Sequence, residues 1–364
     1  MMKKLVKGNE AVVLGSLAAG CDAYFGYPIT PASEIAQLTS EYYLKLGKIF
    51  IQAECEVASI NMLMGGSSAG MRVMTSSSGP GISLMQEGLS FFSGGELPAV
   101  IVDIMRVGPG IGNIGPEQSD YFQIVKGGGH GSYHLIVLAP NSASEMYQMT
   151  IKAFELADQY RMPVVLLADA TLGQMMEAID LVELPLKQSD KKWKLDPTPA
   201  TNQNVITTIY LESADMERHI NHLKEKFEQV ERNEADAETW QTDDAEIVLT
   251  GYGIISRILH TVVDRLRQEG IKAGLLRPKT LWPFPKTVFE KVWRRQTTEN
   301  GKESNGSHSN NPRFLVVELS TGQFIEDVRL SIPNAQIDFY GRVGGDLPSE
   351  DEIIQKVREL MNSF

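Results

Sequence analysis

Two side chains that could bind an acid follow short apolar runs of the sequence. Thr30 lies between Pro28 and Pro31 in GYPITPASE, where the prolines impose a stiff, extended corner and present the hydroxyl. Arg106 directly follows the apolar run Ala99–Met105, and a guanidinium suits a carboxylate ligand. Because ligands bind at the carboxyl ends of strands in open α/β sheets, both positions predict a site. A turn without chemistry and a surface ion pair are the plainer alternatives.

A pair of glutamates could handle a proton. In QAECEVASINMLMGGSSAG, Glu54 and Glu56 stand where a strand ends and a helix of small side chains begins. Such a carboxylate ordinarily stabilises the positive end of the helix. The helix also carries Gly65 and Gly66 and closes at Gly70, so another backbone or a flat ring can approach it closely. On local grounds a capping role and a catalytic role are both open.

The loop VGPGIGNIGPEQSD, residues 107–120, has glycine spacing similar to a dinucleotide-binding fingerprint after a strand. It contains Pro109 and Pro116, no apolar helix follows it directly, and it lacks the acidic residue at the required distance. We therefore interpret it as a flexible loop near a substrate. A nucleotide-binding α/β protein that uses this loop is an alternative.

The elements that must position these residues alternate between strand-like and helix-like patterns as far as about residue 176. Continuous apolar runs such as Ala99–Met105 predict buried strands, and apolar residues at helical spacing predict the helices between them. Strand–helix alternation at this spacing predicts a parallel sheet with helices on both faces. The fold class is therefore α/β.

The pattern also predicts how the chain is divided. We expect one α/β domain over residues 1–185, a connecting segment with a polar helix over 186–244, and a second open α/β domain over 245–364. The acidic stretch 233–244 has almost no apolar residues, so we expect a linker there. Residues 296–312 are rich in Asn, Ser and Gly and predict a polar surface insertion.

Composition excludes several classes of protein. The net charge of −12 with no basic stripe argues against a nucleic-acid binder. No run approaches 18 apolar residues, so we expect no membrane span, and the lysine-rich start lacks the apolar region of a signal peptide. With only Cys21 and Cys55 and no CxxC, a disulfide framework and a cysteine-ligated iron–sulfur or zinc site are excluded in this chain, and the cytoplasm is the expected compartment.

Five stretches, taken in order, resemble the α subunit of 2-oxoacid:ferredoxin oxidoreductases. They are GYPITPASE, QAECEVA with the following GG and AG, TSSSGPGISLMQEG, ELPAVIVDIMR, and PNSASEM leading to AFELADQYRMPVVLLAD. The resemblance covers residues 1–176 without large gaps and continues more loosely to YGRVGGDLPS near the end. It is greatest for the branched-chain type, which acts on 3-methyl-2-oxobutanoate, with the 2-oxoglutarate type next. Each motif alone is weak, but the ordered set is specific.

The resemblance implies thiamine diphosphate as cofactor. In this family two α/β domains hold the cofactor between them, and the first domain here resembles the one that binds the aminopyrimidine ring. The second resembles the transketolase C-terminal fold. A glutamate of the family hydrogen-bonds the ring and promotes loss of a proton from the cofactor, which requires a buried carboxylate able to share a proton. By spacing to Gly65 and Gly70, Glu56 rather than Glu54 matches this glutamate.

Further positions follow from the resemblance. Thr30 and Arg106 match a threonine and an arginine that contact the carboxylate of the 2-oxoacid, so both are expected in the catalytic site with Glu56. The corner and the turn TSSSGPG are expected to line the cofactor pocket, through Pro28, Ile29, Ser78 and Gly79.

Parts of a complete enzyme are missing from the chain. Thiamine enzymes hold the diphosphate through a Mg²⁺ bound by a GDG…N motif, and neither LADATLGQ nor VGGDLPSE supplies its core. We expect no metal site here. The resemblance therefore implies a hetero-oligomer with a β subunit that carries the diphosphate and Mg²⁺ site, and γ-type and ferredoxin-like subunits that carry iron–sulfur clusters.

The resulting hypothesis is oxidative decarboxylation of a 2-oxoacid with coenzyme A and ferredoxin. The sequence shows no second basic residue placed for a distal carboxylate, which favours 3-methyl-2-oxobutanoate over 2-oxoglutarate. Pyruvate or 2-oxoglutarate as substrate, and a catalytically inert structural subunit, are the alternatives.

Overall fold

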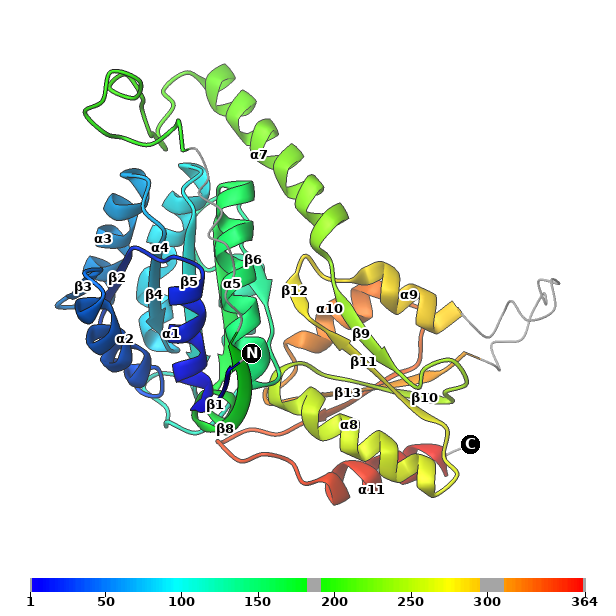
Figure 1. Ribbon diagram of the computed structural model, residues 1–364. Helices are drawn as coiled ribbons and strands as arrows, with labels where there is room; N and C mark the ends of the chain where they lie inside the picture. The colour runs from blue at the N-terminus through cyan, green and yellow to red at the C-terminus, as the bar shows by residue number, and fades with distance from the viewer. Residues whose placement is uncertain (1, 182–190, 295–310, 363–364) are drawn as a thin grey trace.

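The computed structural model describes residues 2–181, 191–294 and 311–362. Its larger sheet has seven strands (Figure 1). In their order across the sheet they are β12 (Thr280–Trp282), β6 (Ile136–Leu138), β7 (Pro163–Asp169), β5 (Ala99–Met105), β4 (Val73–Ser77), β2 (Ala23–Gly26) and β3 (Ile49–Gln52). β12 is antiparallel to β6, and all other neighbours are parallel.

Helices cover both faces of this sheet. α2 (Ser33–Lys45) and α5 (Ala143–Tyr160) connect strands in one direction across the sheet, whereas α3 (Glu56–Ser68) and α4 (Pro80–Gly94) connect strands in the opposite direction. Since such crossovers are right-handed, the two pairs lie on opposite faces. α1 (Gly8–Ala18) packs against α2 and α5. The predicted parallel α/β arrangement is confirmed.

The smaller sheet belongs to the second half of the chain. Its five strands, in order, are β14 (Ile337–Gly341), β13 (Arg313–Glu318), β10 (Ile247–Thr250), β11 (Ala273–Pro278) and β9 (Ala237–Trp240). All are parallel except β9. Its helices form two packed pairs, α8 (Gly253–Gln268) with α11 (Glu350–Met361) and α9 (Lys286–Arg294) with α10 (Phe324–Ser331).

Some expectations about the connections are wrong. The acidic stretch expected to be a linker contains β9, which pairs with β11. The polar helix of the connecting segment is α7 (Ser213–Glu234), and β12 crosses from the second half into the larger sheet. The expected insertion at 296–312 falls almost entirely outside the described residues. The division of the chain at 185 and 245 stays a prediction.

Several short elements were not expected. β1 (Met2–Lys7) pairs antiparallel with β8 (Met176–Leu181), which joins segments far apart in the sequence. A short helix, α6 (Ala170–Gln174), follows β7, and one turn of π-helix, η1 (Phe122–Gly127), follows the region expected to be loop. None of the helices in residues 2–181, 191–294 and 311–362 is both long and apolar enough to cross a membrane.

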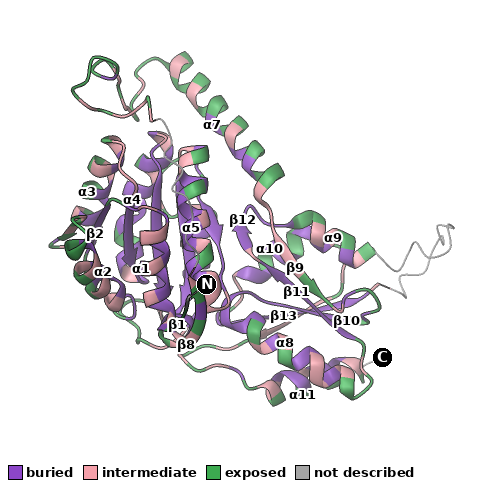
Figure 2. Ribbon diagram, in the orientation of Figure 1, coloured by how far each residue is buried: buried purple, intermediate pink, exposed green. Residues whose placement is uncertain are grey.

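Hydrogen bonds through Gln118 join the two sheets. The backbone N–H of Gln118 donates to the Leu319 carbonyl at 2.7 Å, and its side chain accepts from the Leu319 N–H at 2.9 Å. Its amide also donates to the Tyr252 carbonyl at 3.0 Å. The side chain is fully buried, and the central strands of both sheets form a buried interior (Figure 2), whereas β3, β9 and β14 are partly exposed. Buried hydrogen bonds at this position hold the two halves in one relative orientation.

Candidate active site

The carboxyl ends of four neighbouring strands place the predicted residues along one edge of the larger sheet. β3 leads to Glu56, β2 to Thr30, β4 to Ser78 and Gly79, and β5 ends directly before Arg106. Because these strands are parallel, their ends meet at the same edge, where open α/β sheets bind ligands. One edge of the sheet therefore carries all of these residues.

Glu56 is the first residue of α3, and its side chain is 5% exposed. Gly81 lies against it, since a Cβ built on Gly81 would be 2.5 Å from a carboxylate oxygen of Glu56. Within the described ranges no hydrogen bond or ion pair reaches the Glu56 carboxylate. A carboxylate only accepts hydrogen bonds, so this group is open to a donor from another molecule.

Buried hydroxyl groups without hydrogen-bond partners surround the end of β4. Ser77 and Ser78 are fully buried, and their hydroxyl oxygens have no partner among the described residues. The Ser77 hydroxyl lies 2.2 Å from the position of a Cβ built on Gly81, on the same side as Glu56. Together with the carboxylate they form a polar cluster that could bind a flat ring with hydrogen-bonding edges.

Arg106 joins the corner to the loop that follows β5. Its Nη1 donates to the backbone carbonyl of Thr30 at 2.9 Å, and its Nη2 donates to the carbonyl of Ile111 at 3.1 Å. Its Nε is buried and has no partner in the described part of the chain. The structure therefore brings Thr30 and Arg106 into contact, through the carbonyl rather than the hydroxyl of Thr30.

The remaining predicted residues lie beside these. Pro28 is exposed and Ile29 half-buried, both in the corner between β2 and α2. Glu54, two residues before the start of α3, is exposed, whereas Glu56 is buried, so burial agrees with the choice of Glu56. Gly79 has a φ of +39°, a conformation that favours glycine, and a Cβ there would be 3.7 Å from Arg106 Cγ.

A buried pair of aspartates beneath the Gly79 turn was not predicted as part of the site. Asp103 is fully buried in β5, and neither of its oxygens has a donor among the described residues. Burial, with the neighbouring Asp120 as second cause, raises the pKa of Asp103 well above its usual range. Burial also raises the pKa of Asp120 to about 6, although Asp120 accepts hydrogen bonds from Gly79 N–H at 3.1 Å and Gln123 Nε2 at 2.7 Å. The sequence signal was a lone aspartate in an apolar strand.

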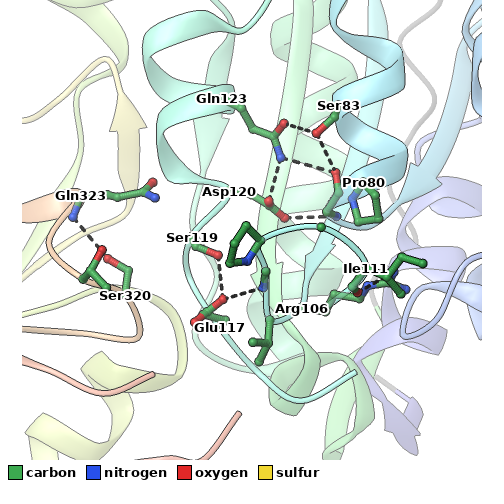
Figure 3. A pocket seen from close by; sticks show the side chains of 16 residues that line it. Pro80, Ser83, Arg106, Ile111, Glu117, Ser119, Asp120, Gln123, Ser320 and Gln323 are labelled. Atoms are coloured by element: carbon green, nitrogen blue, oxygen red, sulfur yellow. Dashed lines mark hydrogen bonds between the residues drawn. The ribbon is translucent and has the colours of Figure 1, made fainter. Parts of the chain in front are cut away.

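A cavity of about 600 Å³ opens beside Arg106, between the two halves of the chain. Figure 3 shows Arg106, Ile111 and Asp120 on the side of the larger sheet, with Ser320 and Gln323 of the second half facing them. The two halves thus share one cavity at the edge of the sheet that carries the predicted residues.

Comparison with protein families supports the sequence resemblance. Residues 14–241 match the family described as "Pyruvate flavodoxin/ferredoxin oxidoreductase, thiamine diP-bdg". Residues 245–353 match "Pyruvate:ferredoxin oxidoreductase core domain II". The chain is 50% identical to the ketoisovalerate oxidoreductase subunit VorB of Methanothermobacter marburgensis, over 99% of this chain and 98% of that protein. It is 33% identical to the 2-oxoglutarate synthase subunit KorA of the same organism, over 97% of each chain.

Comparison with solved structures agrees with the sequence comparisons. A 2-oxoglutarate:ferredoxin oxidoreductase from Magnetococcus marinus, with 2-oxoglutarate, coenzyme A and succinyl-CoA bound, superimposes with a TM-score of 0.85 at 27% identity. The match covers 98% of this chain and 65% of that chain. A split-gene transketolase superimposes with a TM-score of 0.58 at 11% identity, which shows a shared fold only. The chain therefore belongs to the pyruvate:ferredoxin oxidoreductase family, and the predicted resemblance to α subunits of 2-oxoacid:ferredoxin oxidoreductases is confirmed.

Proposed function

We propose that the chain is the α subunit of a thiamine-diphosphate-dependent oxidoreductase that decarboxylates 3-methyl-2-oxobutanoate and transfers the acyl group to coenzyme A and the electrons to ferredoxin. The observation that carries the proposal is the buried carboxylate of Glu56, which has no partner in the described chain. The 50% identity with a ketoisovalerate oxidoreductase subunit supports this substrate rather than 2-oxoglutarate or pyruvate.

The residues at the sheet edge fit the aminopyrimidine half of thiamine diphosphate. Bound thiamine diphosphate supplies the nucleophilic carbon and the electron sink that decarboxylation of a 2-oxoacid requires. The Glu56 carboxylate would share a proton with a nitrogen of the ring, and the unpaired Ser78 hydroxyl offers a further hydrogen bond. The corner residues Pro28 and Ile29 and the Gly79 turn would hold the ring and exclude water.

Arg106 and Thr30 would orient the substrate. The guanidinium of Arg106 attracts the carboxylate of a 2-oxoacid, and each Nη group, which donates one hydrogen to a carbonyl, keeps a second hydrogen for the substrate. The bonds from Arg106 to Thr30 and Ile111 fix the guanidinium before the substrate arrives, which reduces the entropy that binding must overcome. The Thr30 hydroxyl, on an exposed corner, would contact the same carboxylate.

Other chains would complete the enzyme. We assign the diphosphate and Mg²⁺ site to a β subunit, and the iron–sulfur clusters to γ-type and ferredoxin-like subunits, because two cysteines cannot hold a four-cysteine cluster. Both cysteines are free thiols, which is compatible with the predicted cytoplasmic location.

The test uses Glu56→Gln in the co-expressed complex, with Glu54→Gln as the matched control on the exposed neighbour. Glu56→Gln should lower 3-methyl-2-oxobutanoate-dependent ferredoxin reduction by about 100-fold or more, the usual contribution of a proton-transfer group. Glu54→Gln should leave the rate unchanged. Equal rates for wild type and Glu56→Gln would contradict the proposal and favour an inert structural subunit.

A further inference from the structure

The cavity beside Arg106 has an unusual charge balance for a pocket that binds an acid. Among its lining residues in the described chain, Arg106 is the only basic side chain, whereas Glu117 and Asp120 are acidic. Both Nη groups of Arg106 already donate to backbone carbonyls. One carboxylate can therefore be bound here, but a second carboxylate would meet acidic neighbours and no free cation.

Ile111 is an exposed apolar side chain on the rim of this cavity. It is 82% exposed, and its carbonyl accepts the hydrogen bond from Arg106 Nη2. Pro109 and Val107 of the same loop also line the cavity and are apolar, whereas Glu117 and Ser119, which line it as well, are polar. When a ligand covers an exposed apolar side chain at a pocket rim, the burial of that side chain makes binding more favourable.

The loop that carries Ile111 is held in place from both halves of the chain. Val107 and Gly115 join its ends through a backbone hydrogen bond of 3.2 Å, and Gly108 N–H donates to the buried Glu117 carboxylate at 2.9 Å. Asn113 donates to the Gly344 carbonyl at 3.3 Å in the second half. The side chain of Ile111 therefore stands on a fixed backbone, as a selective contact requires.

We propose that Ile111 is a specificity-determining residue, which selects 2-oxoacids with a branched apolar side chain by packing against that side chain while Arg106 binds the carboxylate. The inference rests on the proposed function, because it takes Arg106 as the carboxylate ligand. Arg106 donates to the Ile111 carbonyl and both residues line the same cavity, so one small acid bound at the guanidinium can reach the Ile111 side chain. Burial of a branched apolar group there is favourable, whereas a second carboxylate loses hydration beside Glu117 and Asp120.

The test compares kcat/KM of the whole complex for 3-methyl-2-oxobutanoate, pyruvate and 2-oxoglutarate. Ile111→Ala should lower kcat/KM for 3-methyl-2-oxobutanoate by about 10-fold or more. It should change kcat/KM for pyruvate little, because the single methyl group of pyruvate can make only a small contact with Ile111. Ile111→Lys should shift the ratio of 3-methyl-2-oxobutanoate to 2-oxoglutarate towards 2-oxoglutarate by about 100-fold or more. Ile114→Ala is the matched control, because Ile114 is 63% exposed on the same loop but does not line the cavity.

The outcomes separate this inference from the proposed function. If the wild-type complex reduces no ferredoxin with any 2-oxoacid, the proposed function is wrong. If it is active but Ile111→Ala lowers kcat/KM equally for all three acids, or only weakens assembly of the complex in gel filtration, the role of Ile111 is structural and the inference is overturned. An effect of Ile114→Ala equal to that of Ile111→Ala would overturn it too.

Discussion

Buried carboxylates occur in two regions of the molecule, and their surroundings differ. Glu318, at the end of β13, accepts hydrogen bonds from the Ser320 hydroxyl at 2.8 Å and from the N–H groups of Gln323, Phe324 and Ile325 at 2.9–3.2 Å. At the edge of the larger sheet, the Glu56 carboxylate has no donor in the described chain.

Asp327, another buried acid in the second half of the chain, also receives its donors from the chain. It accepts a hydrogen bond from the Tyr121 hydroxyl at 2.6 Å and pairs with Lys126 at 2.5 Å. These acids stabilise the fold, since the chain itself supplies every donor. A buried acid that the chain leaves without donors is a candidate for chemistry with another molecule. The difference teaches that donor supply, as well as burial, must be considered when candidate functional carboxylates are chosen.

Glutamine substitutions at the two glutamates should separate activity from stability, with the largest effects expected. Glu318→Gln places an amide NH₂ against several N–H donors and should lower the free energy of unfolding by about 2–4 kcal/mol. Glu56→Gln should not lower it, because no hydrogen bond is lost, while it lowers activity by about 100-fold or more. Urea denaturation of both variants measures this. A large stability loss in Glu56→Gln would show that its carboxylate is structural.

Two arginines extend the comparison. Arg277 is 1% exposed and pairs with Glu145 at 2.5 Å and Glu238 at 3.0 Å, whereas the guanidinium of Arg106 donates only to backbone carbonyls. Arg106→Lys should lower kcat/KM for all 2-oxoacids by about 100-fold, because a lysine lacks the planar fork. Arg277→Lys should leave kcat/KM of the folded complex unchanged and lower its melting temperature. Reversed outcomes would contradict the assignment of Arg106 to the substrate.

The aspartate pair predicts a pH effect on stability. A folded-state pKa of about 6 for Asp120, against about 4 unfolded, means that the folded chain binds more protons between these values. This contribution to stability is therefore lost as pH rises from about 4 to about 6, and the raised pKa of Asp103 extends the loss above that window. The Asp103→Asn variant has no proton to lose at this position. Its melting temperature should therefore vary less with pH across this range, and its free energy of unfolding at pH 7 should rise by about 1–3 kcal/mol.

Part of the pH dependence of the melting temperature should remain in the Asp103→Asn variant. Burial also raises the pKa of Asp169 to about 6, while its carboxylate caps α6 through the N–H groups of Thr171 and Leu172. Asp169 thus acts as an internal reference with the same sign. An unchanged profile in Asp103→Asn would show that the pair does not hold a proton.

The smallest effect is expected at the contact between the loop of residues 107–120 and the second half of the chain. Asn113→Ala removes the hydrogen bond to the Gly344 carbonyl and the bond within the loop to Gly115 N–H at 2.7 Å. Because the loop keeps its other bonds, kcat/KM should fall by only about 2-fold to 10-fold, with stability within about 1 kcal/mol. A loss as large as that of Arg106→Lys would mean that this contact controls the loop.

Sequence patterns predicted the larger sheet well because its strands are separated by helices with clear apolar spacing. The bounds of β5 are those of the apolar run Ala99–Met105, which defines the strand in the sequence. β12 has three residues and pairs with a strand far away in the sequence, so local pattern contains no signal for it.

The same limit holds for the site. Glu56, Thr30 and Arg106 follow strands whose ends the sequence marks, so their placement at one edge could be predicted. Their roles rest on the resemblance and stay predictions. The Asp103–Asp120 pair depends on how the loop folds back over β5, and neither residue alone indicates its neighbour.

β12 also constrains how the chain can be synthesised and divided. It covers the outer edge of β6, so the larger sheet is completed only when residues 280–282 have left the ribosome. A truncated chain that stops before them would leave the backbone groups of β6 unpaired at a buried edge, where other chains can add to them. The first half expressed alone should therefore aggregate, and a fused or co-expressed second half should rescue it.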